Sequence, residues 1–163
     1  MQMGRKNIML DSFIKQYLKE KNLPDELYIR EKNRGEIIYP DFNQLGQEIN
    51  KTHFFIVSPR NVDEGSLTGE ISDVTARFYE GMACKTMLVG IKPKDTFDLL
   101  FPNRNAMIEI TDYEGFRDVI DYYLAQPTEY QAIVEENYRY LMAEHTWCHR
   151  ANSLIDFLKN IDQ

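Results

Sequence analysis

The first 50 residues carry two patterns of hydrophobic residues with the spacing of amphipathic helices. In the first pattern, residues three or four positions apart share one face, and the segment 22–24 with its proline ends the helix. The hydrophobic positions of this face are Leu10, Phe13, Ile14, Tyr17 and Leu18. The second pattern runs through Leu45 and Ile49, and Asp41 before it has a side chain suited to a helix N-cap.

Apolar runs between and after these patterns predict the strands. The clearest is HFFIVSP at 53–59, because a continuous apolar run is typical of a strand buried on both faces of a parallel sheet. A helix followed by a strand fits 74–90, and AMIEI at 106–110 and EIIYP at 36–40 are shorter strand candidates. Residues 60–73, rich in glycine, serine and charged residues, predict a loop.

From Asp112 onward the pattern is helical throughout. The predicted helices are 113–126, 129–144 with Thr128 as its cap, and 147–161 with Thr146 as its cap. Strands alternating with helices indicate an α/β fold, in which a Rossmann-like parallel sheet is flanked by helices and the chain ends in helices. In such sheets ligands bind beyond the carboxyl ends of the strands, where we expect the 60–73 loop.

The start of the chain departs from this scheme. An α/β unit of this kind normally begins with a strand, whereas here a helix comes first. The segment before it, residues 1–3, is too short to form a strand. We expect either that the first strand is absent or that another segment fills its place. With 163 residues, of which 43% are hydrophobic, the chain can bury one core, and we predict a single domain over 1–163.

Charge and composition exclude several classes of protein. The formal net charge of −7 disfavours a nucleic-acid surface, which needs clustered Lys and Arg, but it allows a local site for one small anion. No apolar stretch approaches the roughly 20 residues of a membrane span, and the N-terminus has no secretion signal. Cys84 and Cys148 form no C-x-x-C pair, so we predict reduced thiols in a cytoplasmic protein.

The segment TARFYEGMACKTMLVG at 75–90 carries the candidate chemistry. The loop before Thr75 leads into a helix start, where unpaired amides and the positive end of the helix dipole attract an anion. Thr75 can donate its hydroxyl to a phosphate oxygen, and Arg77 can add a bidentate contact. Glu80, one turn on, can accept hydrogen bonds from sugar hydroxyls, and Gly81 allows close approach of a ligand or a strand. Alternatively, Arg77 and Glu80 simply pair on a solvated helix face, which contributes roughly a few tenths of a kcal/mol.

This segment resembles the donor-binding segment of GT-B glycosyltransferases in the group-1 superfamily, whose members read roughly R-x-[FY]-E-x-x-A-x-G-x-x-[LV]. Residues 113–158 are similar to the end of the bacterial-type subgroup that includes CgeB-like spore-maturation proteins, with a helix ending in YYL and an EHT(Y/W)xxR turn into the last helix. MGRKN at 3–7 resembles the Gly-Arg loop after the first strand of that domain, and FFIVSPRN at 54–61 resembles the strand and loop before the donor helix.

The resemblance implies a function. It implies that the chain is the C-terminal half of a GT-B fold, which binds a nucleoside-diphosphate sugar so that the sugar is transferred to an acceptor held by an N-terminal half. This acceptor half is missing here, so the chain alone is expected to transfer little or nothing. The resemblance requires no bound metal and no cofactor besides the nucleotide-sugar substrate.

The resemblance also assigns roles to individual residues. Those implied for the donor diphosphate are Arg5, Lys6, Arg60, Thr75 and Arg77. Glu80 matches the second of two glutamates eight positions apart, which holds the donor ribose. Two departures stand out: Ser72 occupies the place of the first glutamate, where Asp73 or Glu70 could substitute, and Lys85 replaces the glycine that usually follows the helix. A tight turn at Lys85 has a greater steric cost than at glycine.

Two other groups of side chains have simpler explanations than chemistry. His145 and His149 lie four apart beside Cys148, but HTWCH lacks the glutamate of an H-E-x-x-H zinc site, so a capping and packing turn with Trp147 buried is favoured. A set of tyrosines could form a sugar platform, but its helical spacing favours packing in the core and between helices. These tyrosines are Tyr122, Tyr123, Tyr130, Tyr138 and Tyr140.

A second class of function stays open beside the enzyme. Ser72, Lys85 and the missing half also fit a non-catalytic regulatory or interaction module that keeps the fold. In the family the terminal helix crosses toward the other half, so an isolated domain is expected to expose it and to form a homodimer through it. The hydrophobic residues that cover this helix are Leu154, Ile155, Phe157 and Leu158.

Overall fold

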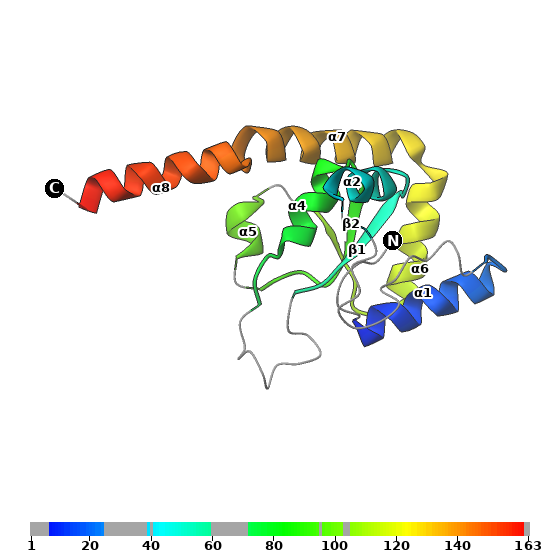
Figure 1. The fold of residues 1–163 in the computed structure, drawn as a ribbon. Coiled ribbons are helices and arrows are strands. Elements are labelled where there is room, and N and C mark those ends of the chain that lie inside the picture. Colours follow the sequence, from blue (N-terminus) through cyan, green and yellow to red (C-terminus); the bar gives the residue numbers. More distant parts are fainter. Residues whose placement is uncertain are drawn as a thin grey trace.

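The computed structural model describes residues 7–24, 39, 41–59, 72–94, 96–102 and 105–161 (Figure 1). The elements are α1 (Ile8–Glu20), α2 (Phe42–Asn50), β1 (Phe54–Val57), α4 (Ala76–Ala83), β2 (Met87–Gly90), α5 (Phe97–Leu100), β3 (Ile108–Glu109), α6 (Tyr113–Ala125), α7 (Pro127–Glu144) and α8 (Trp147–Ile161). The predicted strand at 36–40 and most of the 60–73 loop lie outside the described residues, as do residues 1–6.

The strands form one parallel sheet in the order β1-β2-β3. Phe54 pairs with Met87, Val57 pairs with Gly90, and Val89 pairs with Ile108. Every residue of β2 is buried. This burial explains why the sequence of the strand is a continuous apolar run. The prediction of a parallel α/β sheet is therefore confirmed.

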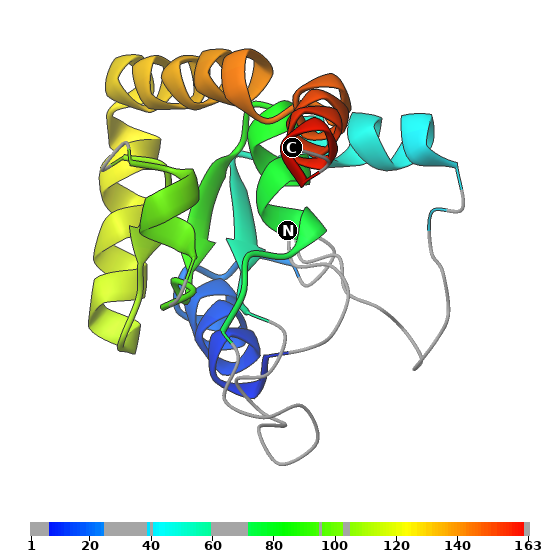
Figure 2. The ribbon, with the colours of Figure 1, turned by 90° about the vertical axis from the view of Figure 1, so that its left-hand side faces the viewer.

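Helices cover both faces of the sheet (Figure 2). Ile56, Met87 and Val89 face a cluster to which α1, α6 and α7 contribute buried residues. Phe55, Val57 and Leu88 point the other way, into a cluster with α2, α4 and α5. Because side chains alternate along a strand, neighbouring residues of β1 and β2 fill two separate cores. This arrangement is the Rossmann-like half domain that the sequence predicts.

Capping side chains set several helix boundaries. Asp41 caps α2 through Asn43 N at 3.0 Å, as predicted, and Asp112 caps α6 through Gly115 N at 2.8 Å. The boundary of α7 corrects the prediction, because the helix begins at Pro127 and not after Thr128. Proline suits the first position of a helix, where its missing N–H would have no partner in any case.

The turn between α4 and β2 accommodates the departure at Lys85. Its φ of +53° is the left-handed conformation that glycine adopts more easily, as the sequence predicted. The Lys85 ammonium donates to Glu135 Oε1 at 2.8 Å and lies 4.7 Å from the centroid of the Tyr138 ring. These contacts offset part of the backbone cost and fasten the turn to α7.

One prediction about aromatic burial is wrong. Trp147 is 90% exposed, because it stands on the first turn of a helix that leaves the body of the molecule. Tyr122 of α6 is 50% exposed, but its hydroxyl donates to Glu129 of α7 at 2.7 Å, which is a contact between helices as predicted for the tyrosines. Tyr130, in contrast, is buried as predicted and donates its hydroxyl to the His53 carbonyl at 2.7 Å.

Gly81 is the point of closest approach between α4 and the sheet. A Cβ placed there would collide with Leu88 Cδ2 and lie 2.7 Å from Phe55 Cδ1, and both side chains are fully buried. We expect Gly81→Ala to lower the free energy of unfolding by about 1–3 kcal/mol, despite the better helix propensity of alanine. Urea unfolding followed by circular dichroism measures this difference, and a stabilised variant would contradict the tight packing.

Candidate functional site

The start of α4 lies at the carboxyl edge of the sheet. β1 and β2 are parallel, so the helix that joins them runs in the opposite direction and begins beyond the end of β1. Thr75 is the N-cap residue, and its side chain makes no capping hydrogen bond. The first amides of an α-helix have no partner within the helix. This end of α4 therefore has donors to offer to an anion.

Arg77 and Glu80 are brought together on α4. Arg77 Nη1 donates to Glu80 Oε2 at 2.8 Å, and the two side chains are 35% and 29% exposed. The pairing is the simpler of the two sequence interpretations, and it leaves both groups within reach of solvent. A ligand at this place would have to separate or share the pair, which is held by a weak i,i+3 contact.

Loops around the start of α4 are fastened to one another. Ser72 Oγ accepts a hydrogen bond from Lys94 N at 3.2 Å, and Thr96 Oγ1 accepts from Val74 N at 3.3 Å. Ser72 therefore joins the segment before α4 to the segment after β2, and this contact gives its hydroxyl a structural role.

A cavity of about 480 Å³ opens at the same edge, beside α5. Its lining combines aromatic and aliphatic walls with charged groups. The lining residues are Lys92, Phe97, Asp98, Phe101, Pro102, Met107 and Glu109. The Phe97 ring lies 5.8 Å from that of Phe78, so the floor of the cavity packs directly against α4.

Asn7 is a polar residue that the sequence interpretation did not single out. It is 2% exposed, and its Oδ1 accepts from Leu10 N at 2.9 Å as the cap of α1. Its Nδ2 is buried and has no hydrogen-bond partner among the described residues. Asparagine directly before a helical pattern is a recognisable cap signal, but the unpaired Nδ2 is visible only in the structure. A buried donor of this kind is costly unless something accepts from it.

A hydrogen-bonded cluster joins α8 to α4. His145 Nε2 lies 2.7 Å from the Leu100 carbonyl, which can only accept, so Nε2 carries the proton. Arg150 Nη2 lies 3.2 Å from His145 Nδ1 and donates to the Tyr79 hydroxyl at 2.9 Å. His149 Nδ1 contacts Thr146 Oγ1 at 2.7 Å. The HTWCH segment is thus a packing turn at the start of α8, and the exposed tryptophan is the part of the prediction that is wrong.

Burial lowers the pKa of His145, and the nearby Arg150 lowers it further, although the hydrogen bond to the Leu100 carbonyl acts in the opposite direction. Glu144 and His149 also face the ring, Glu144 raising this pKa and His149 lowering it. The folded protein therefore favours neutral His145, and the unfolded chain binds more protons below the ordinary pKa of about 6.5.

We expect stability to be retained above about pH 7 and to fall as the pH drops from about 7 to 5. The reason is that protonated His145 has no acceptor to offer to Arg150. Free energies of unfolding in urea across this range measure the slope. A His145→Gln variant keeps a donor for Leu100 and should lose part of the slope; equal slopes in the two proteins would contradict the assignment.

The predicted site residues differ in how far the structure describes them. Thr75, Arg77 and Glu80 lie together on the first two turns of α4, at the carboxyl edge of the sheet. Arg5, Lys6 and Arg60 lie outside the described residues. Among the residues that the structure describes, no group of three or more His, Cys, Asp or Glu could hold a metal ion. None of the described helices is long and apolar enough to cross a membrane.

The fold and this edge define the class of protein: a Rossmann-like α/β half domain whose helix starts and polar side chains gather at the carboxyl ends of parallel strands. A family model described as glycosyl transferase-like matches residues 13–156, and the chain belongs to this family. Membership supports a general role in glycosyl transfer. No curated protein and no solved structure matches the chain.

Proposed function

We propose that the chain binds the nucleoside-diphosphate sugar donor of a GT-B glycosyltransferase of the CgeB-like subgroup. The observation that carries the proposal is the match of residues 13–156 to the glycosyl transferase-like family. The position of α4 supports it, because ligands of open parallel sheets bind beyond the carboxyl ends of the strands. The donor is a substrate, and the proposed site uses no resident cofactor.

In the proposed complex the diphosphate lies at the start of α4. Backbone amides, the Thr75 hydroxyl and the Arg77 guanidinium donate to its oxygens, while Glu80 is released from Arg77 and accepts from the ribose hydroxyls. Negative charge builds up on the diphosphate as the sugar leaves. Donors that are already in place stabilise this charge in the transition state, and one such donor contributes about 3 kcal/mol in other enzymes.

The proposed acceptor site belongs to an N-terminal half, so chemistry would take place in the cleft between the halves. The 163-residue chain by itself is then expected to bind donor and to transfer little or no sugar. Arg5, Lys6 and Arg60 complete the proposed diphosphate site from outside the described residues.

Isothermal titration calorimetry of the full chain with UDP, GDP and ADP, and with the corresponding monophosphates, tests this function. We expect at least one diphosphate to bind, and to bind more tightly than its monophosphate, because the second phosphate reaches the helix start. Failure of all three diphosphates to bind would contradict donor binding.

A second candidate function is a non-catalytic regulatory or interaction module. Two observations favour it: Arg77 and Glu80 already satisfy each other, and Ser72 is engaged with Lys94 N in place of a donor-binding carboxylate. This alternative predicts a folded chain that binds none of the diphosphates, so the same titration separates the two functions.

A further inference from the structure

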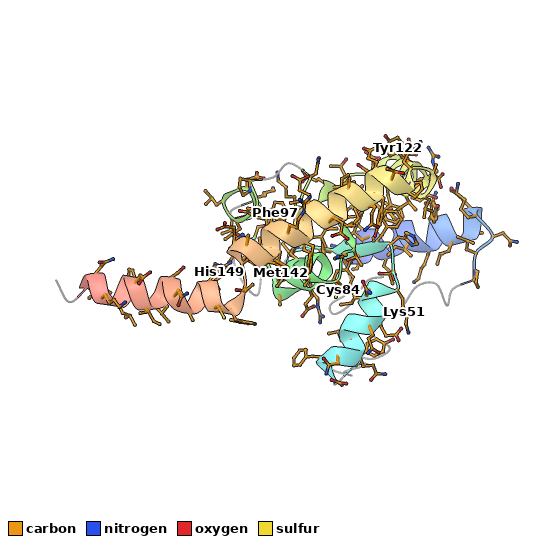
Figure 3. All side chains as sticks on the ribbon, turned by 90° about the horizontal axis from the view of Figure 1, so that it is seen from above. Lys51, Cys84, Phe97, Tyr122, Met142 and His149 are labelled. Atoms are coloured by element: carbon orange, nitrogen blue, oxygen red, sulfur yellow. The ribbon has the colours of Figure 1, made fainter. Side chains whose placement is uncertain are left out.

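A two-residue break separates the last two helices of the chain. α7 ends at Glu144, and α8 begins at Trp147. The His145 amide donates back into α7 at 2.9 Å, whereas the Arg150 amide donates to the Thr146 carbonyl at 3.2 Å at the start of α8. Figures 1 and 3 show α8 leaving the end of α7 and running clear of the sheet. Because a few residues between two rigid elements can act as a hinge, residues 145 and 146 are a place where the direction of α8 can change.

One arginine ties the root of α8 to α4 across this break. Arg150 Nη2 donates to the Tyr79 hydroxyl of α4 at 2.9 Å and lies 3.2 Å from His145 Nδ1. The Arg150 guanidinium also lies 5.7 Å from the centroid of the Tyr79 ring, which is within the range of a cation–π interaction. These contacts are exposed to solvent, so they can be broken and formed again without leaving a buried polar group unpaired.

Aromatic rings back this contact from the side of the protein core. The Tyr79 ring lies 5.4 Å from that of Phe101, and the His145 ring lies 5.0 Å from Phe101 and 5.3 Å from Tyr140. Phe101 is 1% exposed and therefore forms a fixed wall. His145 Nε2 and the Tyr140 hydroxyl both donate to the Leu100 carbonyl, at 2.7 and 3.0 Å. Packed rings favour discrete arrangements over a continuous range, so the contact holds α8 in one setting at a time.

Tyr79 places this contact on the proposed donor helix. It lies in the turn of α4 that runs from Arg77 to Glu80. Donor binding, as proposed above, requires the Arg77–Glu80 pair to separate, and this change takes place in the turn that carries Tyr79. At the other end of the contact is α8, the helix expected to cross toward the acceptor half. The contact therefore joins the two elements that must act together in the proposed enzyme.

We propose that Arg150 and Tyr79 form a coupling joint, through which occupancy of the donor site sets the direction of α8. The inference rests on the proposed function. When Glu80 exchanges Arg77 for a sugar hydroxyl, the turn around Tyr79 shifts, Arg150 follows the hydroxyl, and the root of α8 turns about residues 145 and 146. A ligand shifts such an equilibrium because it binds one setting better, here the setting with Glu80 released. Arg150 and Tyr79 are positioning residues in this scheme, since they act through α4 and do not contact the donor.

Double electron–electron resonance between two nitroxide labels on the full chain tests the proposal. Glu136→Cys on α7 and Asn152→Cys on α8 place the labels at exposed positions on either side of the break, in a Cys84→Ser, Cys148→Ser background. The ligand is whichever of UDP, GDP and ADP binds the chain most tightly by calorimetry. We expect a narrow distance distribution in the free chain and a shift of its mean on saturation with this diphosphate.

Tyr79→Phe removes only the hydroxyl that Arg150 contacts and keeps the ring that packs on Phe101. We expect this variant to bind the diphosphate, to show a broader distribution than the wild type when free, and to lose most of the shift on binding. Tyr122→Phe is the matched control, because it removes a hydroxyl that bonds to Glu129 at 2.7 Å on another surface. It should behave as the wild type does.

The outcomes separate this inference from the proposed function. If none of the diphosphates binds, the proposed function fails and the coupling joint falls with it. If a diphosphate binds but the label distance stays the same, donor binding stands and the joint is overturned. The joint is also overturned if Tyr79→Phe shifts as much as Tyr122→Phe, because the Arg150–Tyr79 contact is then only an anchor for α8.

Discussion

Gly90→Ala is expected to lower the free energy of unfolding by about 3 kcal/mol or more, which is a large fraction of the total stability of a domain of this size. Gly90 ends β2 with a φ of +151°, a conformation that side chains disfavour. A Cβ there would run into the Val57 carbonyl oxygen and would lie 3.0 Å from its carbon. That oxygen cannot yield, because it accepts from Ile91 N at 3.0 Å within the sheet.

Urea unfolding followed by circular dichroism measures the effect of this substitution. Gly46→Ala is the matched control, because among the described residues a Cβ at that position of α2 meets only Cys84 Sγ, at 4.0 Å. We expect this control to be neutral or to stabilise the chain by up to about 1 kcal/mol. If Gly90→Ala were as stable as the control, the close contact between β1 and β2 at this register would be wrong.

Arg77→Ala is expected to weaken the binding of a nucleoside diphosphate by about 10- to 100-fold. A hydrogen bond to a charged group contributes about 1.5–3 kcal/mol, and Arg77 lies in the first turn of α4. Stability should hardly change, since the Arg77–Glu80 pair is partly exposed and contributes about 0–1 kcal/mol. The substitution therefore separates ligand binding from folding.

Calorimetry with the diphosphate that binds the wild-type chain measures this loss. Arg139→Ala removes the same group from an exposed position on α7 and serves as the control. Equal affinities of the Arg77→Ala and Arg139→Ala variants would remove Arg77 from the donor site. Weakening by both variants would instead point to a non-specific effect of net charge.

Local patterns predicted most of the fold. The apolar runs around Phe55 and Leu88 indicate buried parallel strands, because a strand with a helix on each face has no polar side. Asp41 was predictable as a cap, and the turn at Lys85 was expected because the resembling family carries a glycine at this position. For Gly81 the sequence left two explanations open, and contact with the neighbouring strands is the one observed.

Other features depend on contacts between distant parts of the chain. The Arg150–Tyr79 hydrogen bond joins residues 71 positions apart, and nothing in either local pattern specifies it. Trp147 was predicted to be buried as part of a packing turn, whereas its exposure follows from the direction in which α8 leaves α7. That Asn7 Nδ2 has no hydrogen-bond partner among the described residues likewise depends on what surrounds the start of α1.

The sequence predicted where the candidate site lies better than it predicted how Arg77 and Glu80 are paired. The sequence places Thr75 at a helix start and Arg77 and Glu80 on the following turns, and the structure agrees. It could not decide between a ligand-binding pair and a mutually satisfied pair, because i,i+3 spacing permits both. The structure contains the mutually satisfied arrangement, and donor binding requires that Glu80 exchange Arg77 for a sugar hydroxyl.

Backbone amide chemical shifts in ¹⁵N-labelled chain, recorded during titration with a nucleoside diphosphate, test the donor site most directly. The proposal predicts saturable shifts of Ala76 and Arg77 N–H, and loss of these shifts in the Arg77→Ala, Glu80→Ala double variant. Binding of equal strength in the double variant, or shifts confined to elements away from the start of α4, would contradict it.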